Sequence, residues 1–449
     1  MLHGPIWYKV PQFALPVAAT AILQQLFNAS DLAVVGNFSG PGSTAAVAAI
    51  GSNSSIINTI VNLFVGIALG ANVVIAHAVG MKNRSIIHRA VHTSIAASLL
   101  GGVIIAILGQ LIASPLLRLL QVPGEVFPLA LLYLRIYLLG MPVIFLYNFE
   151  AAIFRSVGET KLPLIALAAS GVLNVILNLF FVIVLHMTVD GVAIATVLSN
   201  VVSSALLFCM LRRSALDIRL EIRELRIERD MLLRILQIGL PAGIQSAVFS
   251  AANMVIQSAI NSLGTVVMAA SSAAFNIEIF TYDILTAFGQ ACTTFVGQNF
   301  GAGRLRRCRK TLALCLGEGA LALAIAIAAV LFWGHSLLAI FDSNPEVVAT
   351  GYIRLSLIMI SHSFSLLYDV MSGYLRGFGI SLVPAILTMA GVCGIRVAWI
   401  AFVFPQSPTF TTIMTAFPVS LAVTAAMIFI ALLHYRPTRR FDWIEKHRK

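Results

Sequence analysis

Long apolar runs separated by short polar or charged stretches make up almost the whole chain. The runs at residues 312–333 and 413–433 reach the roughly 20 residues that a helix needs to cross a hydrocarbon core about 30 Å thick. Strands of a membrane barrel would be shorter and would alternate between apolar and polar residues. The pattern therefore predicts transmembrane helices.

The same criterion, applied along the chain, predicts about twelve helical spans. They lie near residues 10–37, 44–80, 86–114, 125–150, 163–186, 189–212, 233–261, 265–299, 311–333, 347–375, 382–405 and 410–434. The first apolar run is longer than the core of a signal peptide and contains Asp31 and three glutamines. We therefore expect it to remain in the mature protein.

Composition strengthens this prediction. Of the 449 residues, 59% are hydrophobic and only 10% are charged, and the mean hydropathy is +0.94. A water-soluble protein of this size could not carry so many apolar side chains without large exposed apolar patches. The chain is therefore predicted to be an all-α, polytopic membrane protein.

The formal charge of +11 matters through its placement rather than its size. If successive connections alternate across the membrane, about 25 of the 29 lysine and arginine residues fall on one side. They include Lys82, Arg84, Arg89, Arg155, Lys161 and the basic stretches 212–234, 304–310 and 436–449. The positive-inside rule makes this side cytoplasmic, so both termini are expected in the cytoplasm. Such stretches are typical of topology signals and of contacts with anionic membrane lipids, and we predict no nucleic-acid partner.

The chain also repeats itself. Residues 154–158 (FRSVG) recur as residues 375–379 (LRGFG), and residues 44–49 (TAAVAA) match residues 265–270 (TVVMAA), both at an offset of 221. A constant offset over separated segments indicates a duplicated unit of six spans. Because six is even, both copies enter the membrane in the same orientation, and a substrate is expected at the interface between the halves.

This repeat divides the chain into four parts. We predict an N-terminal six-helix lobe at residues 1–212, a charged cytoplasmic linker at 213–232, a C-terminal six-helix lobe at 233–434 and a basic cytoplasmic tail at 435–449. Charged and apolar residues alternate at helical spacing in the linker, which is typical of an amphipathic connector.

Asp31 is the most informative polar residue of the first lobe. It lies about seven residues from the outer end of its span, where an ionised carboxylate is costly unless it is hydrated, paired or protonated. Polar residues at comparable depth could surround it as a cation-coupling site. The predicted members are Asp31, Asn174, Asn178, Thr196, Tyr133 and Tyr137. Their oxygens could ligate Na⁺, with Asp31, Asn174 and Asn178 as ligands, or hold the carboxyl in a proton-exchanging site. The alternative for Asp31 is a structural hydrogen bond between helices.

The second lobe carries acids that have no partner at the repeat offset. The predicted substrate-binding residues are Glu278, Tyr282, Asp283 and Asp369. An acid that faces a cavity would attract organic cations and release them when protonated. The alternatives are structural: Asp369 could pair with Arg376, and Arg396 could neutralise one of the acids.

Several segments together resemble one known family. They are residues 66–80 (GIALGANVVIAHAVG), 154–163, 174–178, 191–199 (GVAIATVLS), 296–303 (VGQNFGAG) and 373–384 (GYLRGFGISLVP). Over essentially its whole length the chain resembles the multidrug and toxic compound extrusion (MATE) transporters, in particular their bacterial branch. The resemblance implies a twelve-helix fold of two six-helix lobes in a V shape, in the inner membrane of a bacterium.

The resemblance also implies a secondary active antiporter. It would export drugs, toxins and other small cationic or amphipathic organic compounds in exchange for H⁺ or Na⁺, without a cofactor and as a monomer. Asp31 matches the family's cation-coupling aspartate, and Asn174 and Thr196 match its partners. Some members carry a second aspartate where this chain has Asn178, so the coupling ion stays open between H⁺ and Na⁺.

Three other functions remain to be weighed. A flippase for a lipid-linked precursor would favour several intramembrane arginines, of which the spans hold few. An intramembrane enzyme is not expected, because no HExxH or GxSxG motif lies on the spans. A channel would differ from a carrier in showing flux that does not saturate.

Overall fold

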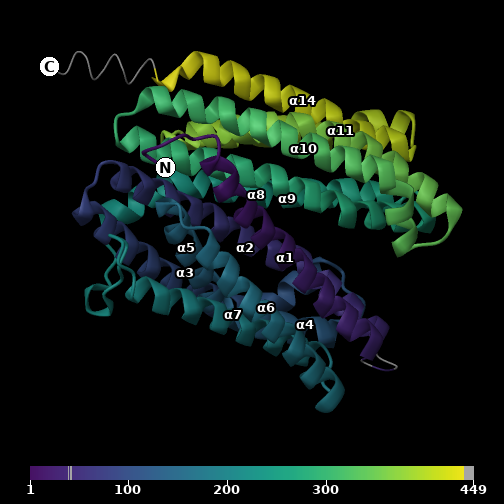
Figure 1. The fold of residues 1–449 in the computed structure, drawn as a ribbon. Coiled ribbons are helices and arrows are strands. Elements are labelled where there is room, and N and C mark those ends of the chain that lie inside the picture. The colour runs from purple at the N-terminus through teal and green to yellow at the C-terminus, as the bar shows by residue number, and fades with distance from the viewer. Residues whose placement is uncertain (39, 41–42, 439–449) are drawn as a thin grey trace. The chain divides into compact units, whose positions relative to one another are not determined.

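The computed structural model of the protein describes residues 1–38, 40 and 43–438. Every regular element in this part of the chain is helical (Figure 1). The first half contains α1 (Lys9–Phe38), α2 (Ser43–Gly80), α3 (Arg84–Leu119), α4 (Phe127–Leu139), α5 (Met141–Val157), α6 (Lys161–Leu179), the π-helix η2 (Phe180–Val184) and α7 (Val189–Arg212). The second half contains α8 (Arg229–Asn261), α9 (Thr265–Gly301), α10 (Leu305–Phe341), α11 (Pro345–Gly377), α12 (Leu382–Thr388), α13 (Ile395–Ala398) and α14 (Phe410–Tyr435).

These helices confirm the predicted all-α membrane class. Among the described residues, ten helices are long and apolar enough to cross a membrane, and the bent pair α4 and α5 makes eleven. Helix α9 corresponds to the remaining predicted span and is 37 residues long. It is not among the ten, and it carries Glu278 and Asp283 together with many serine, threonine and asparagine residues.

Two predicted spans are broken. The span expected at 125–150 is two helices, α4 and α5, which meet at 49°. Gly140 caps α4, and Pro142 follows in the first turn of α5, where its missing N–H costs least. The span expected at 382–405 alternates α-helix with the π-helical segments η4 (Met389–Gly394) and η5 (Trp399–Val403) and ends in the 3₁₀ turn η6 (Phe404–Gln406). Inserted π-helical turns widen the helix and shift its side chains.

The chain forms two compact units. Unit 1 comprises Met1–Ala18, Gly80–Lys82 and Ile244–Lys449, and unit 2 comprises Ala19–Val79 and Asn83–Gly243. Both α1 and α8 contribute to each unit, and their division falls two residues after Pro16 and Pro241. The predicted lobe boundaries at residues 212 and 233 therefore remain a prediction of the sequence repeat, and most of the predicted tail at 435–449 lies outside the described residues.

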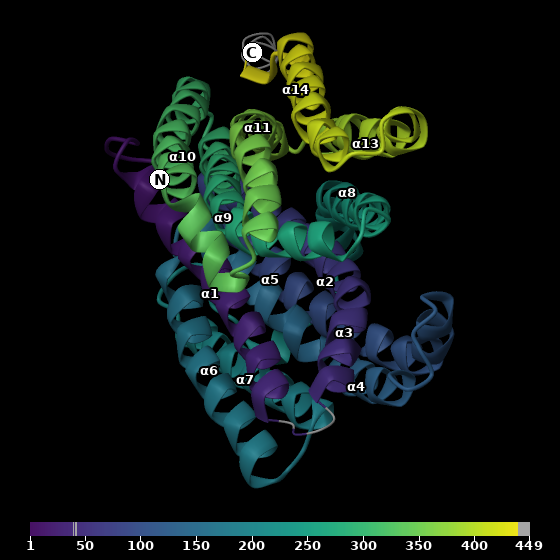
Figure 2. The same cartoon turned by 90° about the vertical axis from the view of Figure 1, so that its right-hand side faces the viewer.

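Unit 1 is built around α9 and α11, which pack against each other and against α10, and α14 packs on α11 (Figures 1 and 2). The N-terminal segment joins this unit. Arg304 donates to the carbonyl of Leu2 at 2.5 Å, and Arg307 donates to the carbonyl of Met1 at 3.0 Å. The start of the chain is therefore attached to the basic end of α10.

In unit 2, α3 packs on α5, and α7 packs on both α5 and α6 (Figure 1). Close glycine contacts bring α2 and the first part of α8 together. A Cβ on Gly66 would lie 2.3 Å from the Cα of Gly243, and a Cβ on Gly70 would lie 2.2 Å from the carbonyl oxygen of Ile235. Only glycine permits such an approach of two helix backbones.

The linker between α7 and α8 is irregular rather than helical, with a turn that includes Ile218, a 3₁₀ turn at Ile222–Glu224 and extended backbone at Glu221 and Leu225. Ile218 and Leu220, two residues apart, are both buried in the core of unit 2. This spacing of two differs from the three- or four-residue spacing that a helical amphipathic connector would show.

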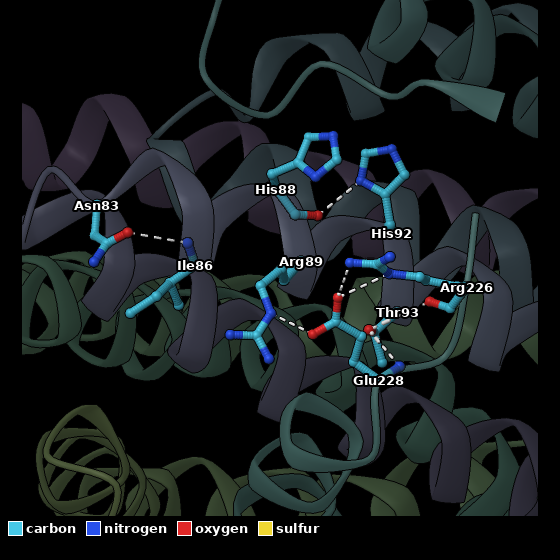
Figure 3. Close-up of polar contacts among 8 residues, drawn as sticks. All are labelled: Asn83, Ile86, His88, Arg89, His92, Thr93, Arg226 and Glu228. Carbon is cyan, nitrogen blue, oxygen red and sulfur yellow. Dashed lines mark hydrogen bonds and ion pairs between the residues drawn. The ribbon is translucent and has the colours of Figure 1, made fainter. Parts of the chain in front are cut away.

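Polar contacts fasten the linker to the start of α3 (Figure 3). Glu228 pairs with both Arg89 and Arg226, and its backbone N–H donates to Oγ1 of Thr93 at 3.2 Å. The backbone N–H of Glu221 lies 3.0 Å from Nε2 of His92. These contacts bind the linker to α3 within unit 2, and we call this segment, residues 213–228, the linker strap.

Candidate functional site

The carboxylate of Asp31 is held by two side chains of unit 2. Asp31 lies on α1, two turns before its end at Phe38, and only 7% of it is exposed. Nδ2 of Asn178 donates to Oδ1 at 2.5 Å. The hydroxyl of Thr196 shares its one proton between Oδ2 at 3.1 Å and the carbonyl of Val192 at 2.9 Å. Three helices, α1, α6 and α7, therefore converge on one buried acid.

Asn174 completes this group, which we call the Asp31 centre (Asp31, Asn174, Asn178 and Thr196). Asn174 precedes Asn178 by one turn of α6, and its Oδ1 accepts from Nδ2 of Asn178 at 3.2 Å. Both asparagines are buried. The sequence predicted these four residues as neighbours, and the structure brings them together.

Gly171 explains how α1 comes so near to α6. A Cβ at this position would lie 1.8 Å from ring carbons of Phe27, so the ring occupies the space of the missing side chain. Phe27 is one turn before Asp31, and Gly171 is one turn before Asn174. The close packing of α1 on α6 at this point therefore places the Asp31 carboxylate beside Asn174 and Asn178.

Tyr133 and Tyr137 lie near the Asp31 centre. In the described structure neither phenol forms a hydrogen bond to it. Their rings on α4 are 6.0 Å apart, and both phenols interact electrostatically with Asp31. They border the centre on the side of α4.

The donor set suits a small cation. Oδ1 of Asn178 is buried and has no hydrogen-bond partner in the described structure, so an acceptor is available beside the carboxylate. One carboxylate and neutral amide and hydroxyl oxygens are the ligands that hard cations prefer. The described residues contain no group of three or more His, Cys, Asp or Glu side chains that could hold a metal ion. The same carboxyl could instead carry a proton, because burial disfavours its charge.

The acids of unit 1 have different surroundings. Glu278 forms a two-point ion pair with Arg354, with Nη2 2.6 Å from Oε1 and Nε 3.0 Å from Oε2. Nη1 of Arg354 donates to Oγ of Ser271 at 2.6 Å, and the guanidinium faces the ring of Phe275. The charge of Glu278 is therefore neutralised within the protein, a pairing that the sequence analysis did not foresee.

Tyr282 connects the other predicted substrate residues. It shares a hydrogen bond with Tyr368 and interacts electrostatically with Asp283 and Asp369. Oδ2 of Asp283 is buried without a partner in the described structure. Oδ2 of Asp369 lies against Gly289, where a Cβ would come within 2.0 Å of it. These three residues thus lie in one region of unit 1.

The arginines expected to neutralise these acids bind elsewhere. Arg376 donates to Oε1 of Gln245 at 2.7 Å and forms no ion pair with Asp369 among the described residues, although the two charges interact electrostatically. Arg396 donates to Oγ of Ser420 at 3.1 Å and lies 4.1 Å from the ring centre of Phe417. Serine and an aromatic face, rather than a carboxylate, hold its charge.

Sequence reasoning missed two buried polar residues, Arg354 and Glu150. Arg354 could have been found as the only cation inside the span predicted at 347–375. Glu150 stood at the predicted end of the fourth span, whereas α5 continues to Val157 and places it inside the helix.

Comparisons with known proteins agree on one family. The sequence profile of the MatE family matches residues 16–180 and 241–402, one segment in each half of the chain. The chain is 25% identical over 438 residues to the "Probable multidrug resistance protein YoeA" of Bacillus subtilis, covering 94% of this chain and 93% of that protein. It is 21% identical over 377 residues to the multidrug export protein MepA of Staphylococcus haemolyticus, covering 84% and 82%.

Solved structures show the same fold. An outward-facing multidrug resistance MATE family transporter of the MOP superfamily superposes with a TM-score of 0.89, at 22% identity and 98% coverage of both chains. A MOP superfamily transporter from Pyrococcus furiosus superposes with a TM-score of 0.88, at 23% identity, covering 96% of this chain and 95% of that one.

Proposed function

The chain belongs to the MatE family of membrane transporters, and from that premise we propose that it is a secondary active antiporter that exports small cationic or amphipathic organic compounds in exchange for H⁺ or Na⁺. The resemblance predicted from the sequence is thereby confirmed at the level of the family. The bacterial relatives and the apolar helices indicate a multi-pass bacterial membrane protein.

The Asp31 centre carries the proposal for the coupling ion. It combines a buried carboxylate, two neutral donors and one unused amide oxygen. Binding of a cation or a proton removes the cost of the buried charge, so the ion changes the relative free energy of conformations that bury or expose the site. We assign Tyr133 and Tyr137 to the wall of this site.

For the organic substrate we propose Tyr282, Asp283 and Asp369. Both carboxyls are half-buried and lack an ion pair in the described structure, so an organic cation would gain charge neutralisation there. We propose that Glu278 contributes to the same site indirectly, because its ion pair with Arg354 neutralises the guanidinium charge beside it.

The flippase alternative has weaker support. The two arginines that are most buried in the described structure are Arg354 and Arg396. Arg354 is bound by Glu278, and Arg396 is bound by Ser420 and Phe417. Neither is available to a phosphate of a lipid-linked precursor.

The placement of positive charge supports both termini in the cytoplasm, and the attachment of the N-terminal segment to Arg304 and Arg307 is consistent with it. We further propose that the protein acts as a monomer surrounded by anionic lipids.

The test is uptake of a fluorescent organic cation into proteoliposomes under separately imposed gradients. A pH gradient or a sodium gradient, applied alone, should drive saturable uptake, and the effective gradient identifies the ion. Uptake that ignores both gradients would contradict the antiport proposal.

A further inference from the structure

Glu150 of α5 is a buried acid of unit 2 outside the Asp31 centre. Its side chain is fully buried, with 0% exposed. Oγ of Ser204, on α7, donates to Oε2 at 2.9 Å, and Oε1 has no hydrogen-bond partner among the described residues. None of the ion pairs in the described part of the chain involves Glu150.

Glu278 provides the contrast within the same protein. Its two oxygens meet two nitrogens of Arg354, so its charge is paired within the protein. Glu150 has one neutral hydroxyl donor instead. Because an unpaired carboxylate in apolar surroundings costs several kcal/mol, the neutral acid is the stable form of Glu150 in this conformation.

Few ionisable groups face Glu150 from its own helix or from the helices around it. On α5, Tyr147 interacts electrostatically with both Glu150 and Arg155. Helix α7 has no ionisable side chain between Asp190 and Cys209. The ionisable residues of the other neighbouring helices are Lys161 on α6, His77 on α2, Tyr133, Arg135 and Tyr137 on α4, and Arg84, His88, Arg89, His92 and Arg118 on α3. Those on α2, α3 and α6 lie at or near helix ends, and Arg84, His88, Arg89 and His92 contact the linker strap.

Rows of polar side chains lead from the Asp31 centre toward Glu150. On α7 the row consists of Thr196, Asn200, Ser203 and Ser204, and on α6 it consists of Asn178, Asn174 and Ser170. Each row repeats at about one turn. Thr196 bonds to Asp31 and Ser204 bonds to Glu150, and eight residues of helix separate them by about 12 Å. Nδ2 of Asn200 donates to the carbonyl of Thr196 at 2.8 Å, and Oγ of Ser203 donates to that of Asn200 at 3.0 Å.

The two acids occupy opposite halves of unit 2. Asp31 is seven residues from the end of α1 at Phe38, whereas Glu150 is seven residues from the end of α5 at Val157. The ends of α5 and α7 carry Arg155 and Arg212, so Glu150 belongs to the basic half of the unit.

We propose that Glu150 is a second proton-binding carboxyl of this transporter, joined to the Asp31 centre by the polar rows of α6 and α7. The step is a simple ionisation: the carboxylic acid releases one proton to water when the basic half opens and regains it when that half closes. Ser204 positions the carboxyl by donating to Oε2. This inference rests on the proposed ion-coupled antiport.

The sequence repeat shows that the Glu150–Ser204 pair occurs in only one half of the chain. At the offset of 221, Glu150 corresponds to Met371 and Ser204 corresponds to Ala425. Met371 is buried, so the equivalent position of unit 1 is filled by an apolar side chain of similar length. The proton site is therefore not required by the fold.

Infrared difference spectra of the purified protein in lipid, recorded between acid and alkaline pH, test the site directly. A titrating buried carboxylic acid gives a carbonyl band that disappears on ionisation. We expect Glu150→Gln to remove one such band, Asp31→Asn to remove another, and Ser204→Ala to shift only the band of Glu150. Ser94→Ala is the matched control, because that buried hydroxyl bonds within α3 to the carbonyl of Ala90. Identical spectra for the wild type and Glu150→Gln would overturn the proposal.

Transport measurements then test whether ionisation of Glu150 is part of ion-coupled transport. Glu150→Gln in proteoliposomes should keep counterflow, the exchange of labelled for unlabelled substrate without a gradient, and should lose accumulation driven by a pH gradient. Undiminished accumulation would contradict the inference. A failure of the antiport proposal can be told apart from a failure of this inference. If the antiport proposal is wrong, the wild-type protein shows no gradient-driven uptake. The infrared spectra still decide whether Glu150 titrates.

Discussion

Two nitrogens of Arg354 hold the two carboxylate oxygens of Glu278, at distances of 2.6 and 3.0 Å. The acid lies on α9 and the base on α11, and both are buried. Among the three acids predicted to bind substrate, Glu278 is therefore held in an ion pair, whereas Asp283 and Asp369 form no ion pair in the described structure.

Breaking this pair from one side should destabilise the protein. Removing one partner of a buried ion pair typically costs about 3–5 kcal/mol, because the other charge is left uncompensated. Glu278→Gln and Arg354→Met should therefore each lower the midpoint of thermal unfolding in detergent. The double variant Glu278→Gln/Arg354→Met should recover most of that loss. Single variants as stable as the wild type would contradict the role of the pair.

Thr196→Val should change ion binding at the Asp31 centre. Loss of a hydroxyl oxygen should weaken Na⁺ binding, whereas loss of a hydrogen bond that stabilises the carboxylate should strengthen proton binding. The substitution keeps the shape of the side chain and removes the hydroxyl that donates to Oδ2 of Asp31. A hydrogen bond to a charged group contributes about 1.5–3 kcal/mol, so the ion concentration for half-maximal uptake should change by roughly ten- to a hundredfold. Thr311→Val is the control, because that buried hydroxyl bonds only to the carbonyl of Arg307 in its own helix. Equal ion dependence in both variants would remove Thr196 from the site.

Gly66→Ala should destabilise unit 2. The added Cβ would lie 2.3 Å from the backbone of Gly243, which cannot move without separating α2 from α8. Overpacking of this kind costs about 1–3 kcal/mol. Gly51→Ala lies on the same helix with no atom within 4 Å of its Cβ, and alanine there should be neutral or slightly stabilising. Thermal unfolding of the two variants decides the prediction, and equal midpoints would refute it.

The linker strap should detach from α3 in acid. The hydrogen bond from the Arg89 guanidinium, with help from Arg226, holds the pKa of Glu228 below its ordinary value of 4.5. Because the folded pKa is the lower one, the stabilisation is complete above about pH 4.5 and is lost as the pH falls through the folded pKa. Hydrogen exchange of the amide at position 228 should therefore lose protection in acid. In Glu228→Gln that protection should already be low at pH 7, and Glu159→Gln, in a different loop, should behave as wild type.

Apolar periodicity and the repeat were enough to predict the helical class and the approximate spans. They could not predict the break at Gly140, because a Gly-x-Pro sequence is compatible with either a kink or a new helix. The irregular linker was missed for a similar reason. Its alternating charges fit a helix surface, and only the burial of Ile218 and Leu220 shows a spacing of two.

The Asp31 centre was predictable because each member is a polar residue at a matching depth in an apolar helix. The partner of Glu278 was not, because Arg354 is 76 residues away and side-chain pairing between helices depends on their rotation. Glu150 was missed because the predicted span ended where the helix continues.

The Asp31 carboxyl is proposed to couple ion movement to substrate movement. The most direct measurement compares gradient-driven uptake with counterflow of the same organic cation in proteoliposomes of Asp31→Asn. We predict that counterflow persists, because the asparagine removes the charge but keeps the shape, and that accumulation under either a pH or a sodium gradient is lost. Gradient-driven accumulation at the wild-type level in Asp31→Asn would contradict the account.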